Sequence, residues 1–123
     1  MLNKDAQILI CDDSILARKS LNGILSSLGY SNIVEVSNGQ DAIDKCKEIN
    51  PELIFLDIVM PVKDGVTATA EIKSNNPDAK IIMVSSVGTQ NHIKEAIKAG
   101  ARDFIQKPID DSLLQQILEN ING

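Results

Sequence analysis

Short apolar runs alternate with longer amphipathic segments along the whole chain. The longer segments place apolar residues three and four positions apart, which is typical of a helix with one buried face. The short runs are bounded by polar or turn-forming residues and predict strands buried in a sheet. These predicted strands lie at 8–11, 33–36, 53–56, 81–84 and 103–106.

A helix is predicted after each strand. Residues that stop helices follow most of these segments, such as Gly29, Asn50-Pro51, Asn76-Pro77 and Gly100. The predicted helices cover 15–28, 40–49, 64–75 and 90–99, and a last helix is capped by Asp110 or Asp111. The apolar residues expected to face inward are Leu21, Ile24, Leu25, Leu28, Ala42, Ile43, Cys46, Ile49, Ile93, Ala96, Ile97, Leu113, Leu114, Ile117, Leu118 and Ile121.

Regular alternation of strand and helix predicts an α/β fold with a parallel sheet, helices on both faces and right-handed crossovers. The run 33–36 carries Glu35, so we expect it at an edge of the sheet. The strand order 2-1-3-4-5 of flavodoxin-like folds fits this expectation. That order is taken from the known fold class and is not dictated by the periodicity.

The composition favours one globular domain, because 123 residues suffice for a single core and no linker interrupts the chain. We therefore expect one domain over 1–123. The net charge is -5, from 12 basic and 17 acidic residues, and no basic run occurs. This argues against nucleic acid or an anionic membrane as a direct partner and favours a metal ion or a basic protein surface.

No signal peptide or membrane-spanning run is apparent, so we expect a cytoplasmic protein. Cys11 and Cys46 are far apart in the sequence and have no metal-ligand spacing. Both occupy apolar positions, which predicts two buried, reduced thiols.

The stretch 53–65 organises the rest of the chain. Its apolar run Leu53-Ile54-Phe55-Leu56 leads directly into Asp57. One interpretation is that Asp57 only caps a turn, since Asp is common in turns. The other is that Asp57 lies at the carboxyl end of a central strand, where parallel sheets bind their ligands.

The second interpretation gains support from the polar residues that follow the other predicted strands: Asp12 and Asp13, Ser85 and Lys107. If the sheet is parallel, these side chains converge on Asp57. Three neighbouring carboxylates repel one another and call for a cation. Mg²⁺ prefers oxygen ligands and keeps positions open, so it can accept a phosphoryl oxygen.

Lys107 then offers a positive charge and Ser85 a hydroxyl to the other phosphoryl oxygens. This set of groups predicts phosphoryl transfer to a carboxylate, with Mg²⁺ as cofactor. Each residue also has a plain structural interpretation. Asp12-Asp13 could cap the first helix, Ser85 could form a turn, and Lys107 could be an ordinary loop lysine.

From near Gln7 to its last helix, the chain resembles a response-regulator receiver domain. The motifs that carry the resemblance are Asp12-Asp13, Asp57 with Met60-Pro61 and Asp64-Gly65, Ser85, and Lys107-Pro108. The run Ser85-Ser86-Val87-Gly88, with Ala99-Gly100-Ala101 and Phe104, is most similar to the single-domain chemotaxis type.

The resemblance implies a role for each of these residues. Asp57 is the expected phosphoacceptor, taking its phosphoryl group from the phosphohistidine of a sensor histidine kinase. Asp12, Asp13, Asp57 and the Val59 backbone carbonyl are the expected Mg²⁺ ligands. Ser85 and Lys107 are expected to bind the phosphoryl group.

The resemblance also implies a switch. Ser85 moves toward the phosphoryl group, and Phe104 turns inward to fill the space. The face formed by the helix at 90–99, the strand at 103–106 and the last helix is then read by a downstream protein. Phe104 has no hydroxyl where many chemotaxis relatives have Tyr. Val59 and Val87 stand where family members often carry polar groups that orient or block water, which predicts slow self-dephosphorylation.

Several alternatives remain open at this stage. The chain could be a receiver excised from a larger regulator or hybrid kinase, or an interaction module that works without phosphorylation. An aspartyl hydrolase is disfavoured because Val59 stands where its second Asp is needed, and a flavin site lacks its phosphate-binding loop. We expect a monomer, with dimerisation on phosphorylation left open, and the sequence does not identify the downstream target.

Overall fold

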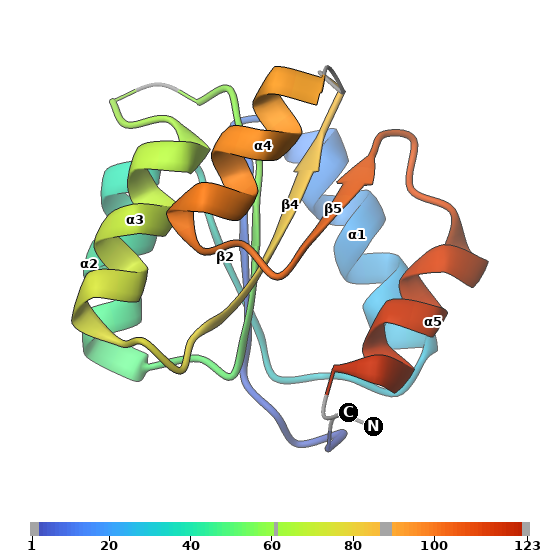
Figure 1. The fold of residues 1–123 in the computed structure, drawn as a ribbon. Helices are drawn as coiled ribbons and strands as arrows, with labels where there is room; N and C mark the ends of the chain where they lie inside the picture. The colour runs from blue at the N-terminus through green and yellow to red at the C-terminus, as the bar shows by residue number, and fades with distance from the viewer. Residues whose placement is uncertain (1–2, 61, 87–89, 122–123) are drawn as a thin grey trace.

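The computed structural model describes residues 3–60, 62–86 and 90–121. A parallel sheet in the order β2-β1-β3-β4-β5 forms its centre, and helices cover both faces (Figure 1). This confirms the predicted flavodoxin-like α/β fold and its strand order. The strands are β1 Ile8–Cys11, β2 Ile33–Val36, β3 Leu53–Leu56, β4 Lys80–Ser85 and β5 Asp103–Gln106. The helices are α1 Ile15–Ser27, α2 Gly39–Ile49, α3 Gly65–Asn75, α4 Gln90–Ala99 and α5 Asp111–Asn120.

Two hydrophobic clusters fill the space between the sheet and its two helix layers. Successive side chains of a strand point to opposite faces, so β3 sends Leu53 and Phe55 to the α1–α5 side and Ile54 and Leu56 to the other. All four are at most 1% exposed. Burial on both faces explains why the central strands appear in the sequence as unbroken apolar runs.

The second strand lies at an edge of the sheet, as predicted. Among the described strands it pairs only with β1, and all four of its residues are partly exposed. Glu35 is aligned with Ile10 of β1. An edge position allows this strand to carry a charged side chain that a central strand would have to desolvate.

The helix ends explain where the loops of the site begin. Ser14 caps α1 by accepting a hydrogen bond from the Ala17 N–H at 3.2 Å, so the interpretation of Asp12-Asp13 as helix caps is wrong. Asp110 caps α5 in the same way, through the Ser112 and Leu113 N–H groups. Gly29 follows α1 with φ of +101°, a conformation that favours glycine.

The structure corrects three predictions of burial and the bounds of one strand, and it shifts three helix ends by one residue. Ile97 of α4 is 50% exposed and Leu113 of α5 is 41% exposed, although both were expected to face inward. Cys46 is only partly buried, whereas Cys11 is buried as predicted, and both thiols are free. Strand β4 also extends one residue beyond the apolar run at each end, which makes Ser85 its last residue.

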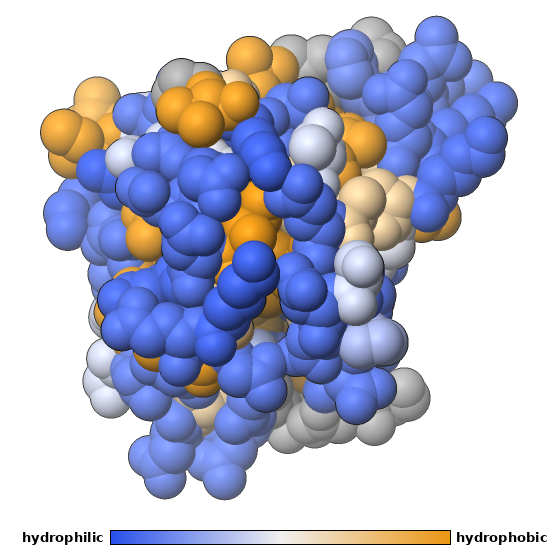
Figure 2. Space-filling view, turned by 90° about the vertical axis from the view of Figure 1, so that its left-hand side faces the viewer, coloured by the Kyte–Doolittle hydropathy of each residue, from blue (hydrophilic) through white to orange (hydrophobic). Residues whose placement is uncertain are grey.

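Most of the surface formed around α2 and α3 is hydrophilic. Figure 2 views the molecule from the left of Figure 1 and shows scattered hydrophobic areas, the largest of them near the top. The connection between β3 and α3 exposes the apolar side chains of Val59 and Val62. Within the described ranges, no helix combines the length and the hydrophobicity needed to cross a membrane.

Candidate functional site

The acidic residues singled out in the sequence lie together at the carboxyl edge of the sheet. Asp12 and Asp13 follow β1, and Asp57 follows β3, its neighbour in the sheet. One carboxylate oxygen from each lies within 4.8 Å of the others. Lys107, after β5, reaches into this group and contacts Asp12 at 2.5 Å and Asp57 at 3.4 Å. The predicted convergence of these four side chains is therefore confirmed.

Every polar atom of Asp12, in its backbone and in its carboxylate, forms a hydrogen bond. Its backbone N–H donates to the Val36 carbonyl at 3.2 Å, and its own carbonyl accepts from Arg18 Nη1 at 2.6 Å. Its carboxylate accepts from the Ser14 N–H at 2.9 Å and from Lys107 Nζ at 2.5 Å. With only 5% exposure, Asp12 is held in one orientation by these four partners.

Asp57 is bound much less completely. It is 8% exposed, and its Oδ2 atom lies 3.4 Å from Lys107 Nζ. Its Oδ1 atom is buried and has no hydrogen-bond partner among the described residues. The side chain therefore does not cap a turn, and the turn-capping interpretation of Asp57 is wrong. A buried, unpaired carboxylate oxygen costs free energy, so this atom calls for a partner that the described residues do not provide.

The pKa of Asp57 is raised above its ordinary value. Burial is the largest cause, and the negative charge of Asp12 adds to it. The charge of Lys107 and hydrogen bonds from Ser85 and Lys107 act in the opposite direction but do not cancel the effect of burial. The carboxyl group of Asp57 is thus harder to ionise than a solvated one.

The pKa of Lys107 is also raised, which in a lysine favours the charged form. Burial alone would lower its pKa, but the hydrogen bond with Asp12 and the charges of Asp57 and Asp12 outweigh that effect and raise it. Lys107 is therefore positively charged at neutral pH. It supplies the one cation that these carboxylates contact among the described residues.

Of four further residues singled out in the sequence, the structure describes Ser85, Val59 and Phe104. Ser85 is 1% exposed at the end of β4, and its hydroxyl lowers the pKa of Asp57. Val59 is 59% exposed in the loop after β3. Phe104 of β5 is half-buried and packs against the cluster on the α2–α3–α4 side. Val87 lies outside the described residues.

A divalent cation fits these residues by two observations. The three carboxylates offer oxygen donors close enough for one ion, and the Asp57 Oδ1 atom is buried without a partner. Oxygen atoms of this kind are the ligands that Mg²⁺ prefers in proteins.

The loop after β3 is held close to the site by small and sulfur-containing side chains. A Cβ on Gly65 would lie 2.0 Å from the Asp57 carbonyl oxygen, so only glycine allows this approach. The Cys11 thiol contacts the sulfur of Met60, a residue of this loop, at 3.2 Å. Burial raises the pKa of Cys11 far above its usual range, so this thiol stays protonated.

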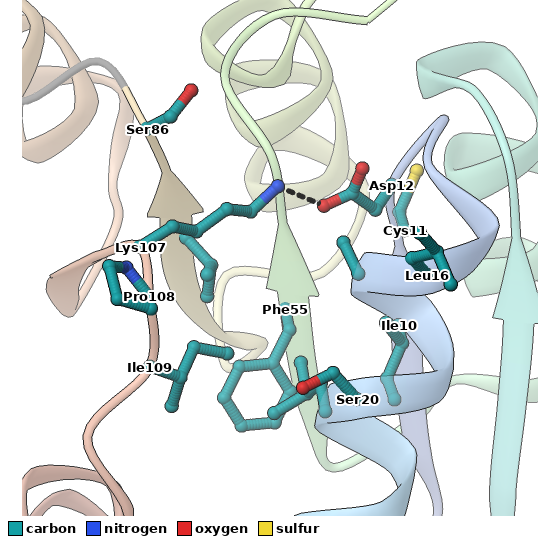
Figure 3. Close-up of a pocket in the computed structure, with 13 residues that line it drawn as sticks. Ile10, Cys11, Asp12, Leu16, Ser20, Phe55, Ser86, Lys107, Pro108 and Ile109 are labelled. Atoms are coloured by element: carbon teal, nitrogen blue, oxygen red, sulfur yellow. Dashed lines mark hydrogen bonds and ion pairs between the residues drawn. The ribbon is translucent and has the colours of Figure 1, made fainter.

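An apolar cavity of about 510 Å³ adjoins the site between α1 and the connection from β5 to α5. Figure 3 shows Lys107 crossing its upper side toward Asp12, with Phe55 below and Pro108 and Ile109 on one wall. Leu16 lines the opposite wall and is 83% exposed. Lys107 lines this cavity as well as contacting the acidic residues of the site.

Sequence reasoning missed the residues that support Asp12. Arg18, which donates to the Asp12 carbonyl, lies on α1, and its partner Glu35 lies on β2. Only the charge of Glu35 inside an apolar strand gave a clue, because a charge there needs a partner.

The fold and the site together define a doubly wound α/β protein with an acidic, lysine-containing centre at the carboxyl edge of its sheet. Residues 8–119 match the response regulator receiver domain family, and the chain belongs to that family. The match agrees with the resemblance inferred from the sequence motifs.

Relatives of known name place the chain near the chemotaxis branch of this family. It is 43% identical to the chemotaxis protein CheY of Bacillus subtilis, over 94% of this chain and 98% of the relative. It is 40% identical to CheY of Thermotoga maritima, over 94% and 97%. A solved complex of CheX, CheY, BeF₃ and Mg²⁺ from Borrelia burgdorferi contains a similar chain, with TM-score 0.89, 32% identity and coverage of 96% and 90%. The chain is thus a response regulator of the chemotaxis type.

Proposed function

We propose that Asp57 accepts a phosphoryl group from the phosphohistidine of a sensor histidine kinase, with Mg²⁺ as cofactor. The observation that carries this proposal is the Asp57 Oδ1 atom, which is buried beside two further carboxylates and has no partner among the described residues. Receiver domains act with histidine kinases, and the Borrelia complex was solved with Mg²⁺, which supports both parts of the proposal.

The chemistry follows from the groups around Asp57. An oxygen of its carboxylate attacks phosphorus, and the bond from phosphorus to the histidine nitrogen breaks. The imidazole keeps the electron pair and takes a proton from solvent. Asp12, Asp13, Asp57 and the Val59 carbonyl would hold Mg²⁺, which when bound neutralises charge on the phosphoryl oxygens.

Lys107 and Ser85 complete the environment of the phosphoryl group. Lys107 is charged and lies 3.4 Å from Asp57, so its ammonium group is in position to pair with a phosphoryl oxygen. Ser85 offers a hydroxyl donor from the end of β4. Both residues stabilise negative charge, and neither has to act as a nucleophile. In this proposal the chain is a phosphoacceptor and is not an enzyme in the usual sense.

The output of the switch is proposed to lie on the face formed by α4, β5 and α5. Phosphorylation adds negative charge and acceptor oxygens that attract Ser85, and Phe104 then turns inward. Ile97 and Leu113, which were expected in the core, are instead exposed on α4 and α5. Exposed apolar side chains on these two helices suit a surface that a downstream protein reads.

The proposal is tested by the intact mass of the protein after incubation with acetyl phosphate and Mg²⁺. The expected result is a gain of one phosphoryl group that is absent in Asp57→Asn and absent when EDTA replaces Mg²⁺. No gain in the wild-type protein would overturn the proposal and favour an interaction module that works without phosphorylation. A gain in Asp57→Asn would move the acceptor to another residue.

A further inference from the structure

We propose that Arg18 is a positioning residue of the metal site and that Glu35, on the edge strand, holds Arg18 in place. The inference rests on the Mg²⁺ site of the proposed function. It concerns two residues, neither of which contacts the acceptor Asp57 in the described part of the structure. The evidence is a chain of hydrogen bonds that leads from β2 through α1 to the backbone of Asp12.

The first link joins Arg18 to the peptide between the two acids. Arg18 Nη1 donates to the Asp12 carbonyl at 2.6 Å, and this carbonyl belongs to the Asp12–Asp13 peptide bond. Because a peptide bond is planar, fixing its oxygen fixes the direction in which the chain continues to Asp13. Arg18 thereby sets the position of Asp13 relative to Asp12, and both carboxylates belong to the same cluster.

The second link fixes the guanidinium group itself. Arg18 Nε donates to Glu35 Oε1 at 3.2 Å, and the side chains of both residues are only 14% exposed. The planar guanidinium group can bond two acceptors at once in a defined geometry, which a lysine cannot reproduce. Arg18 therefore joins the Glu35 carboxylate on β2 to the backbone of Asp12, the residue that follows β1.

Glu35 is itself held by further donors. Its Oε2 atom accepts from Lys19 Nζ at 3.0 Å and from Asn22 Nδ2 at 2.8 Å. Burial alone would raise the pKa of Glu35, but the hydrogen bonds from Lys19, Asn22 and Arg18 and the charge of Lys19 lower it. Glu35 is therefore ionised at neutral pH and remains an acceptor for Arg18.

Two effects of removing Arg18 have opposite signs, which makes the inference testable. Loss of a positive charge near the carboxylates would, by Coulomb attraction, tighten Mg²⁺ binding. Loss of the hydrogen bond to the Asp12 carbonyl would loosen the ligand geometry and weaken binding. Supporting residues of metal sites typically contribute about 10-fold to 100-fold in affinity, so the geometric effect should prevail.

The experiment is calorimetric titration of the purified protein with Mg²⁺ alone. Arg18→Met keeps an apolar stem and removes every donor, while Lys19→Met is the matched control. Lys19 is the next residue of α1, carries the same charge and also binds Glu35, but it forms no hydrogen bond or ion pair with Asp12 among the described residues. The expected result is a Kd for Mg²⁺ raised roughly ten-fold in Arg18→Met and unchanged or slightly lowered in Lys19→Met.

Two further variants separate positioning from general support of the fold. Arg18→Lys should recover part of the affinity, because a lysine can still donate to the Asp12 carbonyl. Glu35→Gln should weaken Mg²⁺ binding less than Arg18→Met does. Urea unfolding in EDTA establishes that each variant is folded, and if Arg18→Met does not fold, Arg18→Lys and Glu35→Gln carry the test. In that case a Kd equal to that of the wild type in both would overturn the inference.

The remaining outcomes are decisive as well. Equal or tighter Mg²⁺ binding by Arg18→Met would overturn the inference and leave Arg18 as a link between α1 and β2 only. Equal weakening in Arg18→Met and Lys19→Met would also overturn it. A wild-type protein that does not bind Mg²⁺ would remove the proposed metal site, and this inference with it. A normal wild-type titration with an unaffected Arg18→Met would leave the proposed function intact.

Discussion

Asp12 and Asp57 end neighbouring strands and contact the same lysine, but their carboxylates are bonded to different extents. Both oxygens of Asp12 have partners, at 2.9 Å and 2.5 Å, and its backbone is bonded as well. Asp57 has one oxygen beside Lys107 at 3.4 Å and one buried oxygen without a partner in the described part of the chain. The protein thus fixes one acid in place and leaves the other with unused bonding capacity.

This difference suits the two proposed roles. Asp12, proposed as a metal ligand only, has to hold its geometry before the ion arrives, whereas Asp57, proposed also as the nucleophile, needs an oxygen that no other group occupies. The unpaired oxygen of Asp57 makes the metal-free protein less stable than it could be. A loss of stability of this kind is common at functional sites, where the missing partner is a ligand.

The largest expected effect comes from removing the cation that the two acids share. Lys107→Met should lower the rate of phosphorylation by about 100-fold to 1,000-fold at saturating Mg²⁺, because a charge that stabilises the transferring group is lost. The rate of mass gain with acetyl phosphate measures this. The same variant should bind Mg²⁺ more tightly than the wild type, because a competing positive charge has left the carboxylates. An unchanged rate would count against the role of Lys107.

A second prediction compares how Asp57 and Asp12 each affect the free energy of unfolding in the absence of metal. In EDTA at neutral pH, Asp57→Asn should raise the free energy of unfolding by about 1 kcal/mol, because a buried charge with an unpaired oxygen is removed. Asp12→Asn should lower it by about 1 to 3 kcal/mol, because charge-assisted bonds to Lys107 and Ser14 are lost. Urea unfolding of the three proteins measures both values. The same sign for both variants would contradict the comparison.

The raised pKa of Asp57 predicts a pH dependence of the same difference. The folded protein binds the Asp57 proton up to a higher pH than the unfolded chain does, so this residue stabilises the fold when protonated. That contribution is present below the ordinary pKa of Asp, about 4, and is lost as the pH rises through the raised value. The advantage of Asp57→Asn over the wild type should therefore grow from about pH 4 to pH 7 in EDTA. A pH-independent difference would argue that Asp57 is not desolvated.

The smallest expected effect concerns the lifetime of the phosphorylated state. Val59 is exposed beside the site and cannot hydrogen-bond to water, so we predict slow self-dephosphorylation. Val59→Asn should change the lifetime of phosphorylated Asp57 several-fold, measured as loss of the phosphoryl mass after the donor is removed. Val62→Asn, three residues further along the same exposed loop, is the control and should leave the lifetime unchanged. A lifetime untouched by Val59→Asn would contradict the prediction.

Two apolar residues that were predicted to be buried are exposed in the structure. Helical periodicity placed Ile97 and Leu113 in the core, but they lie on the surface of α4 and α5. Periodicity reports which positions are apolar and does not distinguish a side chain buried by this chain from one that another protein covers. Both errors fall on the face proposed for partner binding.

The sequence by itself determined the strands, the helices and the identity of the acidic residues. Apolar runs of four residues become strands because a sheet covered on both faces buries every side chain, and the residues after those runs must then meet at one edge. What only the tertiary structure decided is how these residues are bonded. Lys107 lies 95 positions from Asp12 in the chain, and Arg18 of α1 bonds both Glu35 of β2 and Asp12, which follows β1. Such contacts depend on how elements pack in space, so the difference between a fixed Asp12 and an incompletely bonded Asp57 appears only in the folded protein.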